Sequence, residues 1–262
     1  MKDRLREIVE KSSSKDGLSK SDFIKLCKES QLIIFDNEYD LAVEYFKHCG
    51  INLIEKEAKV YSDTVFKEYK DATFCIVDIE TNGNSVDNAQ IIEIGAIKYK
   101  NSKVLDRFES FIRCDFVPEY IQRITNISQK DLVDAPKLKN VLNDFKLFLS
   151  DSVFVAHNVR FDYNFIADSF RKVGLPELLN RRLCTIDLAK KTIESEKYGL
   201  VFLKDKLNID IENHHRAYAD ALSALEVLKI SLKSIPDEVR SVEDLIAFSN
   251  PSKKKKKRRK PR

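Results

Sequence analysis

Two acidic residues at the end of an apolar segment constrain this chain more than any other feature of its sequence. In Phe74–Thr81, four apolar residues are followed by Asp78 and Glu80, which are two positions apart. Because successive side chains of a strand alternate between its faces, these carboxylates point to the same side. They repel each other, and burial increases the cost of their charges, unless a divalent cation compensates them. The alternative is a strand that ends at Val77 with two solvated acids, which is the better interpretation of an isolated pair.

A second acid interrupts an apolar pattern further along the chain. Residues 153–156 are typical of a short buried strand, and the residues that follow predict a turn and the start of a helix. In that helix Asp162 precedes Phe165 and Ile166 by three and four positions, so it lies on the apolar face. A carboxylate at this position either interacts with the helix macrodipole or belongs to a polar site.

The third candidate segment contains a pair of histidines and an acid. His215 and Asp220 are five positions apart, which on one continuous helix separates them by about 140°. They can share a site only if His215 lies in the loop before the helix. The alternative is a surface pair, His214 and His215, beside a solvated acid.

The three segments together supply four carboxylates and no cysteine: Asp78, Glu80, Asp162 and Asp220. Such hard oxygen ligands favour Mg²⁺ or Mn²⁺ over zinc. Two of these ions about 3.5–4 Å apart form the arrangement that promotes in-line displacement at phosphorus. The segments therefore predict a two-metal site for phosphodiester chemistry.

These segments resemble the three motifs of the DnaQ-like (DEDDh) 3′→5′ exonucleases. The family patterns D-x-E-T-x-G, H-N-x-x-F-D and H-x-A-x-x-D are found here at residues 78–83, 157–162 and 215–220. Their order and separations also agree, as does the segment at residues 91–96, and the match spans roughly residues 73–232. Within the family, the chain is most similar to the proofreading epsilon subunit of bacterial DNA polymerase III. The resemblance implies a ribonuclease H-like α/β domain, which agrees with the mixed β-sheet flanked by helices that the apolar pattern predicts.

The resemblance also implies roles for the residues at matching positions. The four carboxylates would bind two divalent metal ions, Mg²⁺ or Mn²⁺, and His215 would accept a proton from the attacking water. The reaction would release nucleoside 5′-monophosphates from the 3′ end of DNA. The positions that help to hold the terminal nucleotide in relatives are here Thr81, His157, Asn158 and Phe161.

Several of these assignments have alternatives. His157 and Phe161 are equally compatible with ordinary packing or turn positions. His214 is the alternative to His215, and the spacing to Asp220 favours His215. An RNA-trimming exoribonuclease would use the same carboxylates, because discrimination of the sugar depends on contacts to its 2′ position. A non-catalytic polymerase subunit that tethers nucleic acid is the remaining alternative, although all five catalytic positions are filled.

The chain departs from the family pattern at two places. Asn82 replaces the commoner second threonine of the first motif. Residues 125–128 (Thr-Asn-Ile-Ser) stand where relatives usually have a glycine-containing turn near the substrate. Neither departure removes a metal ligand, and both leave the substrate preference open.

The composition predicts a folded protein of the cytoplasm. The chain is 43% hydrophobic and 34% charged, which excludes a disordered chain. No apolar run approaches the roughly 20 residues of a membrane span, and the charged start lacks the apolar core of a signal peptide. The five cysteines are far apart and include no CxxC pair, which argues against a disulfide framework or a structural zinc site. We therefore expect a cytoplasmic protein with no membrane association.

Three zones are expected along the chain. Residues 1–70 predict three short helices and a hairpin, typical of a small, mostly helical, winged-helix-like accessory domain. Residues 71–235 form the expected exonuclease domain, in which strands come first and then alternate with helices. Its last short strand is expected at residues 183–186 and its last long helix at residues 217–232. Residues 236–262 are a linker and a polybasic tail.

The first zone suggests binding to a protein partner. Residues 31–35 (QLIIF) are close to the peptide that bacterial polymerase partners insert into the sliding clamp, although the interpretation we favour is a buried apolar segment. Residues 1–70 contain 13 basic and 14 acidic residues, which favours partner binding over DNA binding. The expected partners are a single-stranded or frayed 3′ end of DNA, a DNA polymerase catalytic subunit and the sliding clamp.

The basic charge of the chain is concentrated at its end. Residues 253–262 (KKKKKRRKPR) hold nine of the 46 basic residues, and the rest of the chain has 37 basic against 42 acidic residues. The tail is compatible with an arm that binds phosphates, a solubilising end or a localisation signal. An arm would strengthen nucleic-acid binding in a salt-dependent way without sequence preference.

Overall fold

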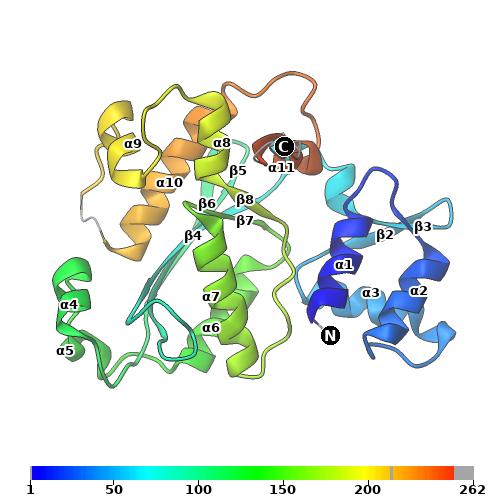
Figure 1. The fold of residues 1–262 in the computed structure, drawn as a ribbon, viewed down its shortest axis with the longest axis horizontal. Coiled ribbons are helices and arrows are strands. Elements are labelled where there is room, and N and C mark those ends of the chain that lie inside the picture. The colour runs from blue at the N-terminus through cyan, green and yellow to red at the C-terminus, as the bar shows by residue number, and fades with distance from the viewer. Residues whose placement is uncertain (1, 213–214, 251–262) are drawn as a thin grey trace, which may run out of the picture.

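The chain folds into a small N-terminal unit and a larger α/β unit that contains the three motifs (Figure 1). The computed structural model describes residues 2–212 and 215–250. His214 and the basic tail therefore lie outside the described residues. The small unit, blue to cyan in Figure 1, lies beside the larger unit next to α11 (Val242–Ser249).

The N-terminal unit consists of three helices and a small antiparallel sheet with the strand order β1-β3-β2. Its helices and strands are α1 (Lys2–Ser12), β1 (Leu18–Ser19), α2 (Lys20–Glu29), α3 (Tyr39–His48), β2 (Leu53–Lys56) and β3 (Lys59–Ser62). The hydroxyl of Ser19 caps α2, because it accepts a hydrogen bond of 3.1 Å from the backbone N–H of Asp22. The three helices and the β2–β3 hairpin are present as expected, and the winged-helix-like assignment stays a prediction. The two-residue strand β1 is too short for the apolar pattern to predict.

A five-stranded mixed sheet forms the centre of the larger unit. Its strand order is β6-β5-β4-β7-β8, in which β7 and β8 run parallel to β4 while β5 and β6 are antiparallel neighbours. The strands are β4 (Phe74–Thr81), β5 (Ile91–Lys100), β6 (Lys103–Phe111), β7 (Val153–Ala156) and β8 (Arg182–Cys184). The α/β fold with a mixed sheet is thereby confirmed.

Helices cover both faces of this sheet (Figure 1). The helices of the larger unit are α4 (Glu119–Thr125), α5 (Gln129–Leu132), α6 (Leu138–Leu149), α7 (Val159–Lys172), α8 (Thr185–Thr192), α9 (Leu200–Leu207), α10 (Ala217–Leu232) and α11. Short 3₁₀ helices lie at η1 (Asp36–Glu38), η2 (Asp63–Val65) and η3 (Tyr69–Asp71). Cys75 and Val77 of β4 pack with α6 and α7, whereas Phe74 and Ile76 pack with α10 and α11. Strand β4 therefore supplies both cores, as the two-residue period of a strand requires.

The alternation along β4 also decides where its acids lie. The strand continues to Thr81, and Asp78 and Glu80 both pair with residues of β5. The alternative in which the strand ends at Val77 with solvated acids is therefore wrong, because pairing with β5 extends the strand through them. By the same alternation, both acids share with Ile76 the face that α10 covers.

The end of the sheet differs from the prediction. The strand expected at residues 183–186 ends at Cys184, because its neighbour β7 ends at Ala156 and offers no further partner. The helix α8 starts at the next residue instead. The apolar pattern also does not predict α5, α8 and α9, which have only four to eight residues each. Helices this short depend on tertiary packing for most of their stability.

The segment that resembles the clamp peptide is only partly buried. Ile33 is 3% exposed and belongs to the N-terminal core, but Ile34 and Phe35 are 72% and 62% exposed. The carboxylate of Glu38 holds the turn by accepting hydrogen bonds from the backbone N–H groups of Ile34 and Phe35, at 2.6 and 2.9 Å. The favoured interpretation as a buried apolar segment is therefore wrong for these two side chains.

The two units dock through a buried ion-pair network around Arg181. Its guanidinium donates hydrogen bonds of 2.7 and 2.8 Å to both carboxylate oxygens of Glu243 in α11, and one of 2.8 Å to Glu10 in α1. Glu243 also accepts a hydrogen bond of 2.7 Å from Thr64 in η2. The side chains of Arg181 and Glu243 are each 10% exposed. Removing one partner would therefore leave a buried charge without compensation.

None of the helices among the described residues is long and apolar enough to cross a membrane. The five cysteines are free, and four of them are buried. Burial raises the pKa of the Cys27 thiol to about 12, so this cysteine carries no thiolate near neutral pH. The buried cysteines behave as small apolar side chains.

We expect Arg181→Ala to reduce the free energy of unfolding by about 3–5 kcal/mol, because it leaves the buried carboxylate of Glu243 unpaired. Urea unfolding followed by circular dichroism measures this change. The matched control is Arg171→Ala, which also removes two ion pairs, with Asp168 and Glu177, but whose side chain is 46% exposed. The control should change the stability by less than about 1 kcal/mol. Equal effects of the two substitutions would contradict a structural role for the buried network.

Candidate active site

The first two motifs meet where β4 ends and α7 begins. Asp78 and Glu80 are half-buried on one face of β4. Asp162 lies in the first turn of α7 and is 4% exposed. Its carboxylate accepts a backbone hydrogen bond from Ile79, which places it directly beside β4. Three of the four candidate carboxylates therefore lie around the end of one strand.

The third motif reaches the same place through the start of α10. The helix begins at Ala217 with Arg216 as its N-cap, so His215 lies in the loop before it. His215 has a φ of +61°, and its backbone N–H donates to Oδ2 of Asp220 at 3.3 Å. This is the position that the five-residue spacing between His215 and Asp220 requires. The alternative, His214, lies outside the described residues.

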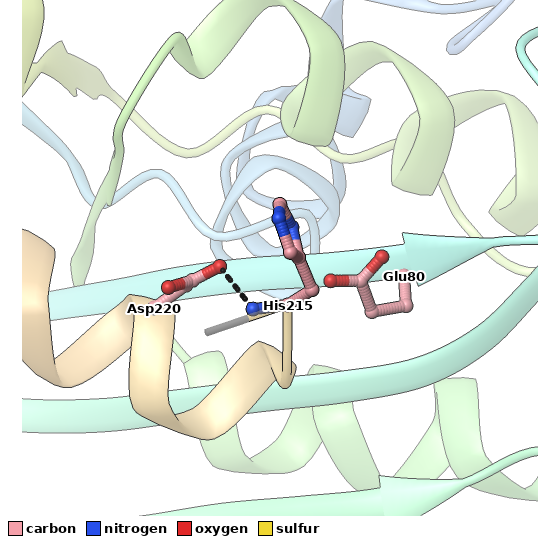
Figure 2. Close-up of side chains that lie close together, drawn as sticks. All are labelled: Glu80, His215 and Asp220. Carbon is pink, nitrogen blue, oxygen red and sulfur yellow. Dashed lines mark hydrogen bonds between the residues drawn. The ribbon is translucent and has the colours of Figure 1, made fainter. Parts of the chain in front are cut away.

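Glu80, His215 and Asp220 form a compact group (Figure 2). One ligand atom from each lies within 4.8 Å of the ligand atoms of the other two. Figure 2 shows the imidazole ring between the two carboxylates, with the hydrogen bond to Asp220 drawn at the backbone nitrogen. The side chain of His215 is exposed, whereas Glu80 and Asp220 are half-buried. The group thus combines inward carboxylates with an imidazole that solvent can reach.

Burial and mutual repulsion raise the pKa values of the carboxylates. The pKa of Asp78 is raised well above its ordinary value, first by burial and then by the charges of Asp162, Asp220 and Glu80. Burial is also the main cause that raises the pKa of Glu80 to about 8 and that of Asp162 to about 7. The charges of Asp220, Glu93 and Asp162 add to the shift of Glu80. The three motifs therefore share one electrostatic environment.

This donor set fits divalent cations. Carboxylates held together in a partly buried site keep their protons near neutral pH unless a positive charge compensates them. Carboxylate oxygens are the ligands that Mg²⁺ and Mn²⁺ prefer, and the group contains no thiolate that would favour zinc. The residues that could hold such ions are Asp78, Glu80, Asp162 and Asp220.

A buried acid on β5, which the sequence analysis leaves without a role, anchors α10. Glu93 is 1% exposed, and its carboxylate accepts hydrogen bonds of 2.8 and 3.1 Å from the guanidinium of Arg216. It also accepts one of 3.0 Å from the backbone N–H of Ala217 at the start of α10. Glu93 therefore caps this helix and holds the loop that carries His215. The sequence signal is an acid inside the apolar run at residues 91–97.

Gly95 allows α10 to approach β5 closely. A Cβ atom at this position would collide with the backbone of Ala217 and Tyr218 in the first turn of α10. These are backbone atoms, so they cannot move aside as a flexible side chain would. A side chain at residue 95 would push α10, and with it Asp220, away from the sheet.

His157 is bound on both ring nitrogens by the protein itself. Its Nε2 donates to the carbonyl of Tyr198 at 2.9 Å, and its Nδ1 lies 2.8 Å from the hydroxyl of Thr185. Because a carbonyl only accepts, Nε2 carries the proton and Nδ1 accepts from Thr185. Burial lowers the pKa of His157 to about 4, so the ring is neutral. These contacts favour the turn or packing alternative for His157 over a contact with a nucleotide.

The other three expected substrate residues differ in exposure. Asn158 is exposed at the N-cap of α7 with a φ of +77°. Phe161 is 37% exposed, and its ring packs 5.8 Å from that of Phe165. Thr81 is 8% exposed, and its hydroxyl donates to the carbonyl of Gly83 at 2.7 Å. Asn158 and Phe161 therefore offer surface to a ligand, whereas Thr81 shapes the turn after β4.

The two departures from the family pattern have local structural explanations. The side chain of Asn82 donates to the carbonyl of Phe116 at 3.0 Å and accepts from the backbone N–H of Gln90 at 2.7 Å. Asn82 thus ties the segment before α4 to the end of β4. Asn126 ends α4 with a φ of +55°, the left-handed conformation that glycine commonly supplies and asparagine tolerates.

Comparison with known proteins assigns the site to a family. A family model described as exonuclease (RNase_T) matches residues 75–228, which is more than half of the chain. The chain therefore belongs to this exonuclease family.

Curated relatives and solved structures agree with this assignment. The chain is 39% identical over 156 residues to the PolC-type DNA polymerase III of Staphylococcus saprophyticus, and 39% identical over 154 residues to that of Staphylococcus aureus. Each match covers 58% of this chain but only 11% of the polymerase, so the chain spans about a tenth of the length of these relatives.

Two solved structures share the fold at lower identity. Exonuclease X in complex with 5′ overhanging duplex DNA aligns with a TM-score of 0.52 and 22% identity, over 68% of this chain and 99% of that one. E. coli exonuclease I in complex with single-stranded DNA aligns with a TM-score of 0.56 and 18% identity. The alignment covers 62% of this chain and 41% of that one. These likenesses confirm the ribonuclease H-like exonuclease fold.

We expect the stability of the metal-free protein to fall as the pH rises from about 4 to about 8. The folded pKa values of Glu80 and Asp162 are about 8 and about 7, against about 4 in an unfolded chain. The folded state therefore keeps protons that the unfolded state has released, and this contribution is complete below about pH 4 and lost above about pH 8. Mg²⁺ should replace these protons, so it should raise the melting temperature more at about pH 8.5 than at about pH 5.5. Scanning fluorimetry with Mg²⁺ or EDTA measures the difference.

Asp162→Asn provides the isosteric test of this interpretation. It should raise the melting temperature of the metal-free protein near pH 8, by about 2–4 °C for each kcal/mol of relieved repulsion, and reduce the shift caused by Mg²⁺. The control is Asp168→Asn, which lies on the same helix but has a 30% exposed side chain. It should change neither the melting temperature of the metal-free protein nor the shift caused by Mg²⁺. An undiminished Mg²⁺ shift in Asp162→Asn would contradict the assignment.

Proposed function

We propose that this chain is a metal-dependent 3′→5′ exonuclease that releases nucleoside 5′-monophosphates from DNA 3′ ends. The observation that carries the proposal is the convergence of the three motifs: the charges of Asp162 and Asp220 raise the pKa values of Asp78 and Glu80, and His215 lies beside Glu80 and Asp220. Membership of the exonuclease family supports the nuclease activity. The motif pattern supports the 3′→5′ direction.

Each residue has a distinct role in this proposal. Asp78, Glu80, Asp162 and Asp220 hold two divalent ions, which when bound supply positive charge to the phosphate oxygens and activate water. His215 accepts a proton from the water that attacks the terminal phosphodiester. A bond forms between the water oxygen and phosphorus, and the bond from phosphorus to the 3′ oxygen of the preceding nucleotide breaks. One nucleoside 5′-monophosphate leaves, and the shortened strand keeps a free 3′-hydroxyl.

Exposed aromatic side chains near the site support a single-stranded or frayed 3′ end as the substrate. Phe116 and Tyr120 are 68% and 51% exposed, and the hydrogen bond from Asn82 to the carbonyl of Phe116 keeps this segment beside the first motif. Aromatic faces stack bases of any sequence. We favour DNA over RNA because the curated relatives are DNA polymerases. An RNA-trimming exoribonuclease with the same site is the second candidate.

The same relatives support a place in DNA replication, as a proofreading or repair activity that works with a polymerase catalytic subunit in the cytoplasm. We propose that residues 1–70 are an accessory domain that docks a protein partner. The exposed side chains of Ile34 and Phe35 support the sliding clamp as that partner, because exposed apolar groups of this size commonly mark interaction sites.

We expect Asp162→Ala to reduce exonuclease activity by of the order of a thousandfold or more, because the change removes a metal ligand while leaving the fold intact. The assay uses 5′-labelled single-stranded DNA and RNA of equal sequence, with Mg²⁺, Mn²⁺ or EDTA. The expected result is a metal-dependent ladder that shortens from the 3′ end of DNA and is absent in the variant.

The outcomes of this assay separate the candidate functions. Asp168→Ala, on the same helix, is the control and should retain activity. Near-full activity of Asp162→Ala would refute its role as a metal ligand. Preference for RNA would keep the mechanism and change the substrate. No product from either nucleic acid, with the fold intact, would favour a non-catalytic subunit.

Deleting residues 252–262 distinguishes an enzyme with a nucleic-acid-binding arm from a tether. The deletion removes nine positive charges, so KM for DNA should rise at low salt while kcat is retained, and the difference should shrink as the salt concentration increases. Steady-state kinetics at two salt concentrations measure both parameters. A loss of kcat at saturating DNA would contradict the arm.

A further inference from the structure

A hollow of about 450 Å³ lies beside the candidate active site, where three elements meet. The start of α7, the junction of β8 and α8, and the end of α11 form its walls, and these elements lie together in Figure 1. Its polar lining residues include Asn158, Arg160, Arg182, Asp187, Lys190 and Asn250. Arg160 is two residues from Asp162 in the first turn of α7, about 3 Å away along the helix axis and about 160° around it. Asn158, one of the expected substrate residues, also lines the hollow.

The lining of this hollow is positively charged. It contains the cations Arg160, Arg182 and Lys190 and a single acid, Asp187. Asp187 is paired with Lys190 at 3.4 Å, whereas neither Arg160 nor Arg182 forms an ion pair with another of the described residues. The guanidinium of Arg182 packs over the ring of Tyr163 at 5.0 Å. Two arginine charges therefore remain available to an anion.

The end of the described chain adds a second observation. Asn250 lines the hollow, and the nine basic residues of the tail begin three residues later. Because both are positively charged, the tail is not suited to occupy the hollow. One polyanion that contacts both would neutralise both.

We propose that this hollow binds a backbone phosphate of the nucleic-acid strand, on the 5′ side of the scissile bond. The proposal rests on the proposed function, because it places the strand relative to the carboxylates. A positive hollow lined by the same turn of α7 that carries Asp162 is the charge pattern that suits a strand whose terminal phosphodiester lies at the acids. DNA and RNA share the phosphate, so substitutions in the hollow should weaken the binding of both.

The test is the double variant Arg160→Gln/Lys190→Gln in the full chain. Fluorescence anisotropy in EDTA measures binding of a labelled single-stranded 12-mer of DNA or RNA. We expect the dissociation constant to rise by about tenfold at low salt. The slope of log K against log salt should fall by about 0.7, the value for the one phosphate that the variant no longer neutralises. The matched control is Lys25→Gln/Lys103→Gln, which removes two exposed charges away from the hollow and should change both quantities much less.

Kinetics with Mg²⁺ then separate this inference from the proposed function. The p-nitrophenyl ester of thymidine 5′-monophosphate has no upstream phosphate, so the double variant should hydrolyse it as the wild type does, while KM for the 12-mer rises. Equal effects of the double variant and its control on 12-mer binding would overturn the inference. A loss of ester hydrolysis in the double variant would also overturn it, because the charges would then act at the reacting atoms. If the wild type cleaves neither substrate, the proposed function fails, and the binding measurement in EDTA still decides the inference.

Discussion

The ion pair between Glu93 and Arg216, and the absence of a side chain at Gly95, hold the start of α10 against the sheet. The carboxylate of Glu93 on β5 accepts hydrogen bonds from Arg216 and from the first backbone N–H of α10. Gly95, two residues further along β5, removes the Cβ that would otherwise collide with the same turn. The loop that carries His215 and the helix that carries Asp220 are placed by these two contacts. Without them the third motif would not reach the acids of β4.

The same closeness concentrates negative charge in a partly buried space. Burial is the first cause of the raised pKa values of Asp78, Glu80 and Asp162, and repulsion between neighbours adds to it at Asp78 and Glu80. A scaffold with apolar cores on both faces of the sheet holds these groups together, because the packed strands and helices cannot move apart to relieve the repulsion. A divalent cation would supply the positive charge that makes this arrangement favourable.

Charge of the opposite sign lies next to these acids. The first turn of α7 carries Asp162 toward β4 and Arg160 toward the hollow that Asn250 also lines. The proposed substrate would contact both signs of charge. Cations would bind its backbone phosphates, and carboxylates with metal ions would lie at its terminal phosphodiester. The Arg181 network links α11 to α1 of the N-terminal unit.

Local pattern and spacing determined much of this protein. The strands of the sheet and the helix at residues 217–232 follow from periodicity over a few residues, and the three motifs follow from their resemblance to a known family. The five-residue spacing to Asp220 requires His215 to precede its helix if the two residues share a site. Only the tertiary structure decided the role of Glu93, which contacts a residue 123 positions away, the internal hydrogen bonds of His157, the exposure of Phe35, and the cationic hollow. Periodicity reports which side of one element is apolar. It contains no information on which distant element will cover that side, and these features all depend on contacts between elements that are far apart in the chain.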